Sequence, residues 1–182
     1  MDELVDILDE EGKYKGISLM KSQAHQKGLF HPTVHVWFYT PNGQILIQQR
    51  GKDKDTYPLL WDVSVAGHVG AGENIKISAV REIEEEIGLK IKPSDLHKIG
   101  IFKSVQKHSE SLIDCEFHHT FLVELRVSLE NLTKQESEVE DLKLVSITQF
   151  EEELGNEEKS KKYVPHSSDY YKTILAEVKK LA

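Results

Sequence analysis

One segment of this chain, residues 67–89 with the sequence GHVGAGENIKISAVREIEEEIGL, constrains the fold more than any other. It joins a glycine-rich loop to a stretch in which apolar residues recur every four positions: Ile75, Ala79, Ile83 and Ile87. Such a period is typical of a helix with one buried face. Asn74 precedes the pattern, and Gly88 ends it as a C-terminal glycine commonly does. The segment predicts a loop and then a helix of about three to four turns that packs against a sheet.

Three glutamates of this helix share one face. Glu82, Glu85 and Glu86 stand at i, i+3 and i+4, which brings their side chains together. Their repulsion costs about a few tenths of a kcal/mol for each neighbouring pair. A divalent cation would offset it, and Mg²⁺ binds through a few carboxylates together with substrate phosphate oxygens. A Glu-rich helix is more commonly a solvated surface, but here Glu73 ends the glycine-rich loop and Arg81 precedes the glutamates.

The spacing of these residues resembles the Nudix box, the signature of the Nudix hydrolase family. Each constrained position carries the residue type that the box requires: Gly67, Glu73, Arg81, Glu82, Ile83, Glu85, Glu86, Gly88 and Leu89. The resemblance implies an α+β fold, the Nudix α/β/α sandwich with a mixed β-sheet. It implies attack of water on a diphosphate bond with Mg²⁺ or Mn²⁺ as cofactor. It also implies metal ligation by Glu82, Glu85 and Glu86, with the Gly67 carbonyl as a further ligand.

The same resemblance assigns roles to the other polar residues of the box. Glu73 and Arg81 are expected to tie the loop to the helix, hold the carboxylates in place and help to position the water. Bound cations would bridge phosphate oxygens and lower the pKa of the bound water. The proton acceptor is left open between a box carboxylate, such as Glu82 or Glu85, and Glu116 on a later strand.

Beyond the box, the chain is similar to the branch of the family that contains type I isopentenyl-diphosphate isomerase and isomerase-like hydrolases. The matching stretches are 42–50 (NGQILIQQR), Pro58, Trp61-Asp62 and Gly67-His68. In the isomerase, a metal is bound by a histidine after the box glycine, two N-terminal histidines and two acids on a later strand. The matching residues here are His68, His31, Asp114 and Glu116, with His25 one position out of register. Asp114 and Glu116 are expected to face one side of their strand.

Two departures from the isomerase favour a hydrolase. Ala66 stands where the isomerase has its essential cysteine, so allylic isomerisation lacks an acid/base partner. Leu144 is expected at the place of a late tryptophan that shields a carbocation-like centre. Cys115 does not replace the thiol, because it should point away from the two acids beside it. An isomerase is therefore the less favoured alternative, and a noncatalytic module is disfavoured because every box carboxylate is present.

The remainder of the chain predicts strands with helices between and after them. Residues 33–40 and 44–50 are rich in β-formers and flank Pro41-Asn42-Gly43, the strongest hairpin signal in the sequence. Further strands are expected at 4–8, 61–65, 96–105, 112–125 and 142–147, and helices after an N-cap at Thr148 and over about 168–181. Because no internal repeat is visible, we expect a single domain over 1–182.

Composition limits the partners of this chain. Its 182 residues include 23 basic and 31 acidic ones, and the net charge of −8 argues against a nonspecific nucleic-acid binder. The single cysteine excludes an internal disulfide framework. The start lacks the pattern of a signal peptide, and no apolar run reaches membrane-spanning length. We expect a cytoplasmic protein without a membrane partner, with 168–181 as a candidate homodimer element.

The expected partner is a small-molecule diphosphate, either a nucleoside diphosphate linked to another moiety or a related organic diphosphate. Aromatic candidates for stacking on it are Phe30, Trp37, Tyr57 and Trp61, although core packing is favoured for Trp37 in its strand. The loops at 52–60 and 103–111 are expected to govern specificity. Neither loop carries a motif that names the substrate.

Overall fold

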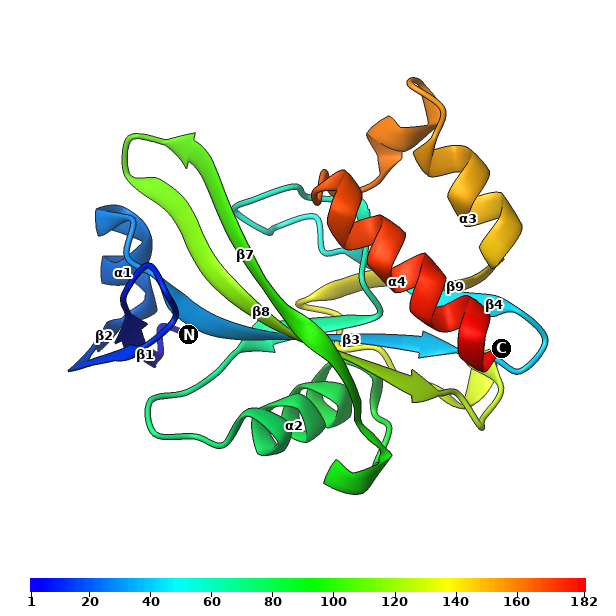
Figure 1. Cartoon of the computed structure of the whole chain (residues 1–182), viewed down its shortest axis with the longest axis horizontal. Coiled ribbons are helices and arrows are strands. Elements are labelled where there is room, and N and C mark those ends of the chain that lie inside the picture. The colour runs from blue at the N-terminus through cyan, green and yellow to red at the C-terminus, as the bar shows by residue number, and fades with distance from the viewer.

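The protein, described by a computed structural model over residues 1–182, is built on a mixed seven-stranded sheet (Figure 1). Five strands run in the order β5–β4–β3–β8–β7, while β6 pairs with β3 and β9 pairs with β4. Only β3 and β8 pair in parallel. The strands are β3 (His31–Tyr39), β4 (Gln44–Arg50), β5 (Trp61–Asp62), β6 (Val65–His68), β7 (His97–Ser109), β8 (Leu112–Glu124) and β9 (Val139–Ser146).

Helices cover both faces of this sheet (Figure 1). On one face lies α2 (Ile75–Ile87), and on the other lie α3 (Ile147–Leu154) and α4 (Ser168–Leu181). Side chains alternate along a strand, so Val36 and Phe38 of β3 enter the core under α2, whereas Trp37 between them enters the core under α3 and α4. The predicted α+β fold with three layers, helix on sheet on helix, is confirmed.

The helix α2 begins and ends where the sequence predicts. The side chain of Asn74 accepts hydrogen bonds from two backbone N–H groups of the first turn, and Gly88 ends the helix with φ +67°. Ala79, Ile83 and Ile87 are completely buried against the sheet. The four-residue apolar period therefore sets how α2 is rotated on the sheet, and this rotation places Glu82 and Glu86 beside β6 and Glu85 nearer to solvent.

The predicted hairpin forms, but its two strands separate soon after the turn. The N–H of Gly43, at φ +79°, donates to the carbonyl of Thr40 at 3.0 Å. Strands β3 and β4 pair at Tyr39 and Ile45. Farther from the turn, β6 lies beside β3 in the place that β4 would take in a continuous hairpin.

The side chain of Ser64 bridges the separated strands. Its hydroxyl accepts the N–H of Phe38 at 2.9 Å on β3 and donates to the carbonyl of Leu46 on β4. Ser64 lies between β5 and β6, where the sequence predicts one strand over 61–65. That prediction is wrong, because the chain leaves its pairing with β4 at Asp62 and resumes pairing with β3 at Val65.

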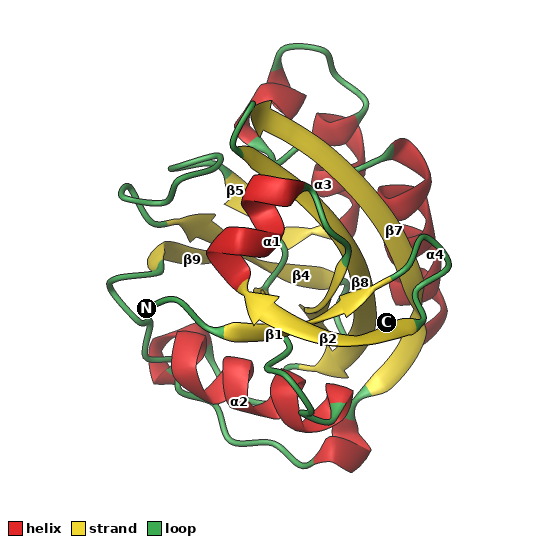
Figure 2. Cartoon of the chain, turned by 90° about the vertical axis from the view of Figure 1, so that its left-hand side faces the viewer, coloured by secondary structure: helices red, strands yellow, loops and turns green.

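A small N-terminal unit precedes the sheet (Figure 2). It consists of β1 (Leu4–Leu8), antiparallel β2 (Tyr14–Met20) and α1 (Lys21–Lys27). The sequence predicts β1 but not β2 or α1. The outer half of β2 is exposed, and α1 buries only Ala24, so neither shows an apolar period. The unit is attached to the box loop, where the N–H of Ala71 donates to the carbonyl of Leu4 at 2.8 Å.

The C-terminal elements follow the predictions closely, with one correction. Helix α4 occupies the predicted residues 168–181. Helix α3 begins earlier than predicted, because Ser146 and not Thr148 is its N-cap and accepts the N–H of Gln149 at 3.1 Å. The reason is packing, since Ile147 is buried in the core and so belongs to the inward face of the helix. Short 3₁₀ turns occur at Pro93–Asp95, Leu129–Asn131 and Lys159–Lys162. No helix combines the length and apolar character needed to cross a membrane.

We expect Ser64→Ala to lower the free energy of unfolding by about 2–4 kcal/mol, because two buried backbone groups lose their hydrogen-bond partner. Denaturant titration followed by circular dichroism measures this change. Ser137→Ala is the matched control, since Ser137 is exposed, and it should change stability by no more than about 0.5 kcal/mol. Equal stability of the two variants would contradict the bridging role of Ser64.

Candidate active site

A polar cleft of about 490 Å³ opens between α2, the loop after β4, the β7–β8 hairpin and the start of α4. Only five of its 29 lining residues are hydrophobic, so the cleft suits a polar or charged molecule. Its lining includes seven residues predicted as metal ligands: Gly67, His68, Glu82, Glu85, Glu86, Asp114 and Glu116. The fold thus gathers residues from three separate elements, β6, α2 and β8, into one space.

Gly67 lies so close to Glu82 that no side chain fits between them. A Cβ atom at Gly67 would overlap the carboxyl group of Glu82. Gly67 pairs with Val34 in the sheet and does not have a positive φ. The glycine at the start of the box is therefore required for close approach of α2 to β6, and not for a turn.

Arg81 connects the glycine-rich loop to the glutamates. Its Nε and Nη2 donate to the two carboxylate oxygens of Glu73, each at 3.0 Å. Its Nη1 donates to Glu82 at 2.7 Å and to Glu85 at 3.3 Å, and Nη2 also donates to the carbonyl of His68 at 3.1 Å. All five N–H groups of the guanidinium thus have acceptors. Hydrogen bonds from Arg81 lower the pKa of Glu73 to about 2, so Glu73 is ionised at neutral pH.

Glu82 and Glu86 are buried carboxylates, whereas Glu85 lies at the rim with 48% of its side chain exposed. Glu86 accepts hydrogen bonds from the side-chain amide of Gln48 at 2.7 Å and from the N–H of Ala66 at 3.3 Å. Burial raises the pKa of Glu82 to about 7 and that of Glu86 to about 8. Because their charged forms are disfavoured by burial, a bound cation would stabilise them strongly.

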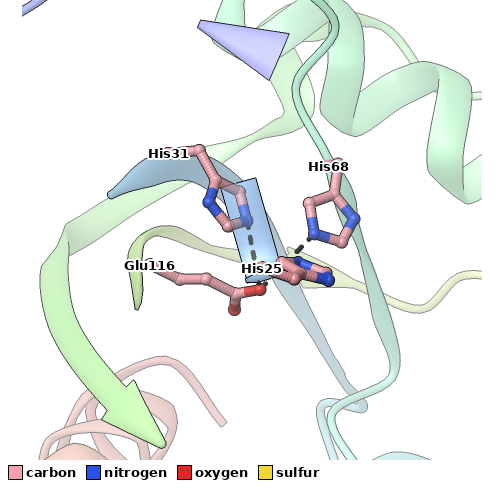
Figure 3. Close-up of side chains that lie close together, drawn as sticks. All are labelled: His25, His31, His68 and Glu116. Carbon is pink, nitrogen blue, oxygen red and sulfur yellow. Dashed lines mark ion pairs between the residues drawn. The ribbon is translucent and has the colours of Figure 1, made fainter. Parts of the chain in front are cut away.

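Four side chains from four elements converge beside the box (Figure 3). They are His25 of α1, His31 of β3, His68 of β6 and Glu116 of β8, and one potential ligand atom of each lies within 4.8 Å of the others. The Nε2 atoms of His31 and His68 lie 3.5 Å and 3.4 Å from the same oxygen of Glu116. The structure therefore brings together the three histidines and one of the two acids singled out in the sequence.

Strand register puts these residues side by side. In the parallel pairing of β3 with β8, His31 lies opposite Glu116. In the antiparallel pairing of β3 with β6, His68 lies opposite Thr33, which is on the same face of β3 as His31. The rings of His31 and His68 stack with 5.2 Å between their centroids. Only His25 depends on the attachment of the N-terminal unit.

The donor atoms of this group fit a divalent metal ion. The Nε2 atoms of His25, His31 and His68 are buried and have no hydrogen-bond partner, which is costly for polar atoms. The Nδ1 of His31 donates to the carbonyl of Leu29 at 2.9 Å, which leaves Nε2 as the ring atom that could bind a metal. Burial lowers the pKa of His31, but Glu116 outweighs burial and raises it, so a bound metal would displace a proton from this ring. Burial and the neighbouring histidines lower the pKa of His25 to about 4, which leaves that ring neutral. Imidazole nitrogens together with a carboxylate suit transition metals.

Asp114 lies at the edge of this group and contacts a histidine that the sequence analysis misses. Its Oδ1 lies 3.7 Å from Nε2 of His25, and its Oδ2 lies 3.0 Å from Nε2 of His108. The ring of Tyr57 meets His108 edge-on at 5.1 Å. Burial raises the pKa of Asp114. Knowing which residues of β7 and β8 pair would have predicted that His108 lies beside Asp114. The turn at 109–112 has no sequence signal strong enough to predict that pairing.

Three further histidines line the cleft: His35, His118 and His166. The rings of His35 and His118 stack with 4.0 Å between centroids. His35 lies four residues after His31 on β3, and His118 lies two residues after Glu116 on β8, so both face the cleft. The alternation of side chains along a strand could therefore have predicted the positions of His35 and His118. His166 precedes α4 and could be located only from the docked helix.

The structure also places the apolar and aromatic residues that the sequence analysis singled out. Leu144 of β9, expected at the place of a shielding tryptophan, pairs with Leu46 of β4, packs with the core under α2 and is not among the cleft-lining residues. Cys115 is buried on the other face of β8 from the acids, as predicted. Trp37 is a core residue, as favoured. Of the four aromatic candidates, only Tyr57 lines the cleft.

Comparison with known proteins agrees with this geometry. The NUDIX domain profile matches residues 29–166. The chain is 36% identical over 169 residues to Nudix hydrolase 3 of Arabidopsis thaliana, covering 91% of this chain but only 22% of that longer protein. It is 34% identical over 200 residues to an uncharacterised Nudix hydrolase of Clostridium acetobutylicum, covering 96% of each. Isopentenyl-diphosphate Delta-isomerase of Serratia proteamaculans is 30% identical over 122 residues, covering 67% of this chain and 66% of the isomerase.

Solved structures share the fold at low sequence identity. The protein DR0079 of Deinococcus radiodurans superposes with a TM-score of 0.69 at 16% identity, covering 98% of this chain and 99% of that one. The NUDIX domain of Shewanella oneidensis NrtR, solved with ADP-ribose, gives a TM-score of 0.58 at 13% identity and covers 83% and 88%. On the profile match and the near full-length bacterial relative, the chain belongs to the Nudix family, whose hydrolases act on pyrophosphate bonds.

Proposed function

We propose that this chain is a Mg²⁺- or Mn²⁺-dependent hydrolase that cleaves the diphosphate bond of a nucleoside diphosphate derivative or a related organic diphosphate. One observation carries the proposal. Glu82, Glu85 and Glu86 line a single polar cleft, and the guanidinium of Arg81 bonds to two of them. A noncatalytic module would have no reason to keep three mutually repelling carboxylates on one wall of a cleft.

Each residue of the box has a task in this proposal. Glu82, Glu85 and Glu86 hold the cation, with the Gly67 carbonyl as a further ligand, and Glu73 and Arg81 are positioning residues. When bound, the cation supplies charge neutralisation on the phosphate oxygens and a more acidic water. Glu85 suits the role of proton acceptor, because it is half exposed and its hydrogen bond to Arg81 is long. Glu116 is less suited, since histidines surround it.

We infer a second metal position at the group formed by His25, His31, His68 and Glu116, with Asp114 beside it. The buried, unpartnered Nε2 atoms support this inference. Nitrogen ligands suit a transition-metal ion better than Mg²⁺, which prefers oxygen. The two positions are therefore expected to differ in metal preference, with Mn²⁺ able to occupy both.

An isopentenyl-diphosphate isomerase is the alternative function, favoured by the named relatives with about 30% identity. Against it stands Ala66, which lines the cleft and offers no proton. The one cysteine, Cys115, is buried outside the cleft. The small share of hydrophobic lining residues also provides little apolar surface for an isoprenoid chain.

The cleft volume fits a small-molecule partner. A cytoplasmic location and a homodimer remain predictions from the sequence. For the dimer, α4 is a weak element, because its apolar residues Tyr170, Ile174 and Val178 are already buried against the sheet.

The substrate is tested with a panel of nucleoside di- and triphosphates, sugar and dinucleotide diphosphates, and isopentenyl diphosphate. Each is incubated with Mg²⁺ or Mn²⁺, and the products are followed by ³¹P and ¹H NMR. Cleavage of a diphosphate bond supports the hydrolase. Conversion of isopentenyl diphosphate into its allylic isomer without phosphate release would reverse the ranking of the two functions.

We expect Glu86→Gln to reduce hydrolysis by about 100-fold or more, because a neutral amide cannot hold the cation that stabilises the transition state. The matched control is Glu84→Gln on the same helix, since Glu84 faces solvent and pairs with Lys90. The control should retain kcat and KM. Comparable loss of activity in both variants would show that helix charge, and not the metal site, is responsible.

We expect His31→Gln and His68→Gln to weaken Mn²⁺ binding at the histidine group by about 10- to 100-fold. Isothermal titration calorimetry with Mn²⁺ alone, together with electron paramagnetic resonance of the bound ion, measures this without turnover. His97→Gln is the control, because His97 is exposed at the start of β7. Unchanged Mn²⁺ affinity in both site variants would eliminate the second metal position.

A further inference from the structure

His35 has a defined proton position although it lies deep in the cleft. Its Nδ1 lies 2.6 Å from the hydroxyl oxygen of Tyr170, and that oxygen also accepts the indole N–H of Trp37 at 2.9 Å. Tyr170 is 2% exposed, so its own proton needs an acceptor, and Nδ1 of His35 lies at a short hydrogen-bonding distance from it. His35 therefore accepts at Nδ1 and carries its proton on Nε2. Burial lowers the pKa of His35, which keeps the ring neutral.

His166 is held by a hydrogen bond that it donates, whereas His35 is held by one that it accepts. Its Nε2 lies 2.7 Å from Oδ1 of Asp62, and Oδ2 of Asp62 accepts a hydrogen bond from Arg50 at 3.2 Å. Burial opposes ionisation of Asp62, but His166 and Arg50 outweigh it and hold the pKa of this carboxyl well below its usual range. An ionised carboxylate only accepts, so His166 donates from Nε2. This ring uses only its Nε2 in hydrogen bonds within the protein, so its Nδ1 is left for a ligand.

The two rings are neighbours in the cleft. Their centroids lie 5.4 Å apart with the planes at 69°, and stacking on His118 at 4.0 Å fixes the plane of His35. His35 offers the N–H of its Nε2, and His166 offers Nδ1, a ring nitrogen that no protein group uses. A hydroxyl group can both accept and donate, so it satisfies these two nitrogens whether or not Nδ1 of His166 carries a proton, whereas an isoprenyl carbon bonds to neither.

We propose that His35 and His166 form a hydroxyl-binding subsite, which recognises a hydroxyl of a sugar ring in the organic part of the substrate. This inference rests on the proposed diphosphate hydrolysis, because it concerns the group that the diphosphate carries. Tyr170 and Asp62 are positioning residues that fix the protons of the two imidazoles. A site built to hydrogen-bond a hydroxyl discriminates strongly against an analogue that lacks it.

The probes are the diphosphates of adenosine, guanosine, cytidine and uridine, each compared with its 2′,3′-dideoxy counterpart in the presence of Mn²⁺. Kd is measured by calorimetry for probes that bind without turnover, and KM and kcat are measured for probes that are cleaved. The absence of cleavage then counts against the proposed hydrolysis. The ratio of the affinities for the hydroxylated and the dideoxy probe tests the subsite separately.

For at least one base, the wild-type protein should bind the hydroxylated probe about tenfold or more tightly than the dideoxy probe. His35→Phe and His166→Phe should remove that difference by weakening the hydroxylated probe alone. Tyr170→Phe keeps the buried ring but removes the proton given to His35, and it should reduce the ratio as well. The control His119→Phe, on the opposite face of β8 and outside the cleft-lining set, should retain the wild-type ratio.

Two outcomes overturn the subsite. One is a wild-type protein that binds none of the four hydroxylated probes or binds each pair equally. The other is a set of variants that weaken both members of a pair by the same factor, which indicates general damage to the cleft. Because Tyr170→Phe tests the same proton arrangement from the core, instability of His35→Phe does not prevent a decision.

Discussion

The five hydrogen bonds of the Arg81 guanidinium are the constraint on which the site depends. They join the loop at Glu73, the backbone of β6 at His68 and the helix at Glu82 and Glu85. Arginine stays protonated across the physiological range and Glu73 stays ionised at neutral pH, so the bond between these two residues persists. With it in place, Glu82, whose burial disfavours ionisation, is held beside β6.

The adjacent residues Gly67 and His68 link the two halves of the cleft. Gly67 allows the carboxyl group of Glu82 to pack on the strand, and the ring of His68 joins the histidine group. Successive residues of a strand face opposite sides, and a slip of one residue would exchange them. The register of β6 against β3 therefore sets the carboxylate cluster and the histidine group at the same time.

Local pattern predicted much of the fold, and tertiary contact decided the rest. Helix α2 is readable because Ala79, Ile83 and Ile87 repeat with the helical period and all become buried. Helix α1 is not readable, since it buries only Ala24 and is stabilised by neighbours remote in sequence. The break at Ser64 is invisible for a similar reason, because its hydroxyl bonds to backbone groups 18 and 26 residues away.

The sequence by itself determined the chemistry of the box: the spacing of its acids, the paired Glu73 and Arg81, and the lack of a thiol at position 66. These are relations within one loop and helix, where spacing along the chain fixes distance in space. Only the tertiary structure joined His166 to Asp62, 104 residues apart, and His35 to Tyr170, 135 residues apart. Such contacts follow from strand register and helix docking, which depend on burial summed over the whole sheet and leave no local period in the sequence.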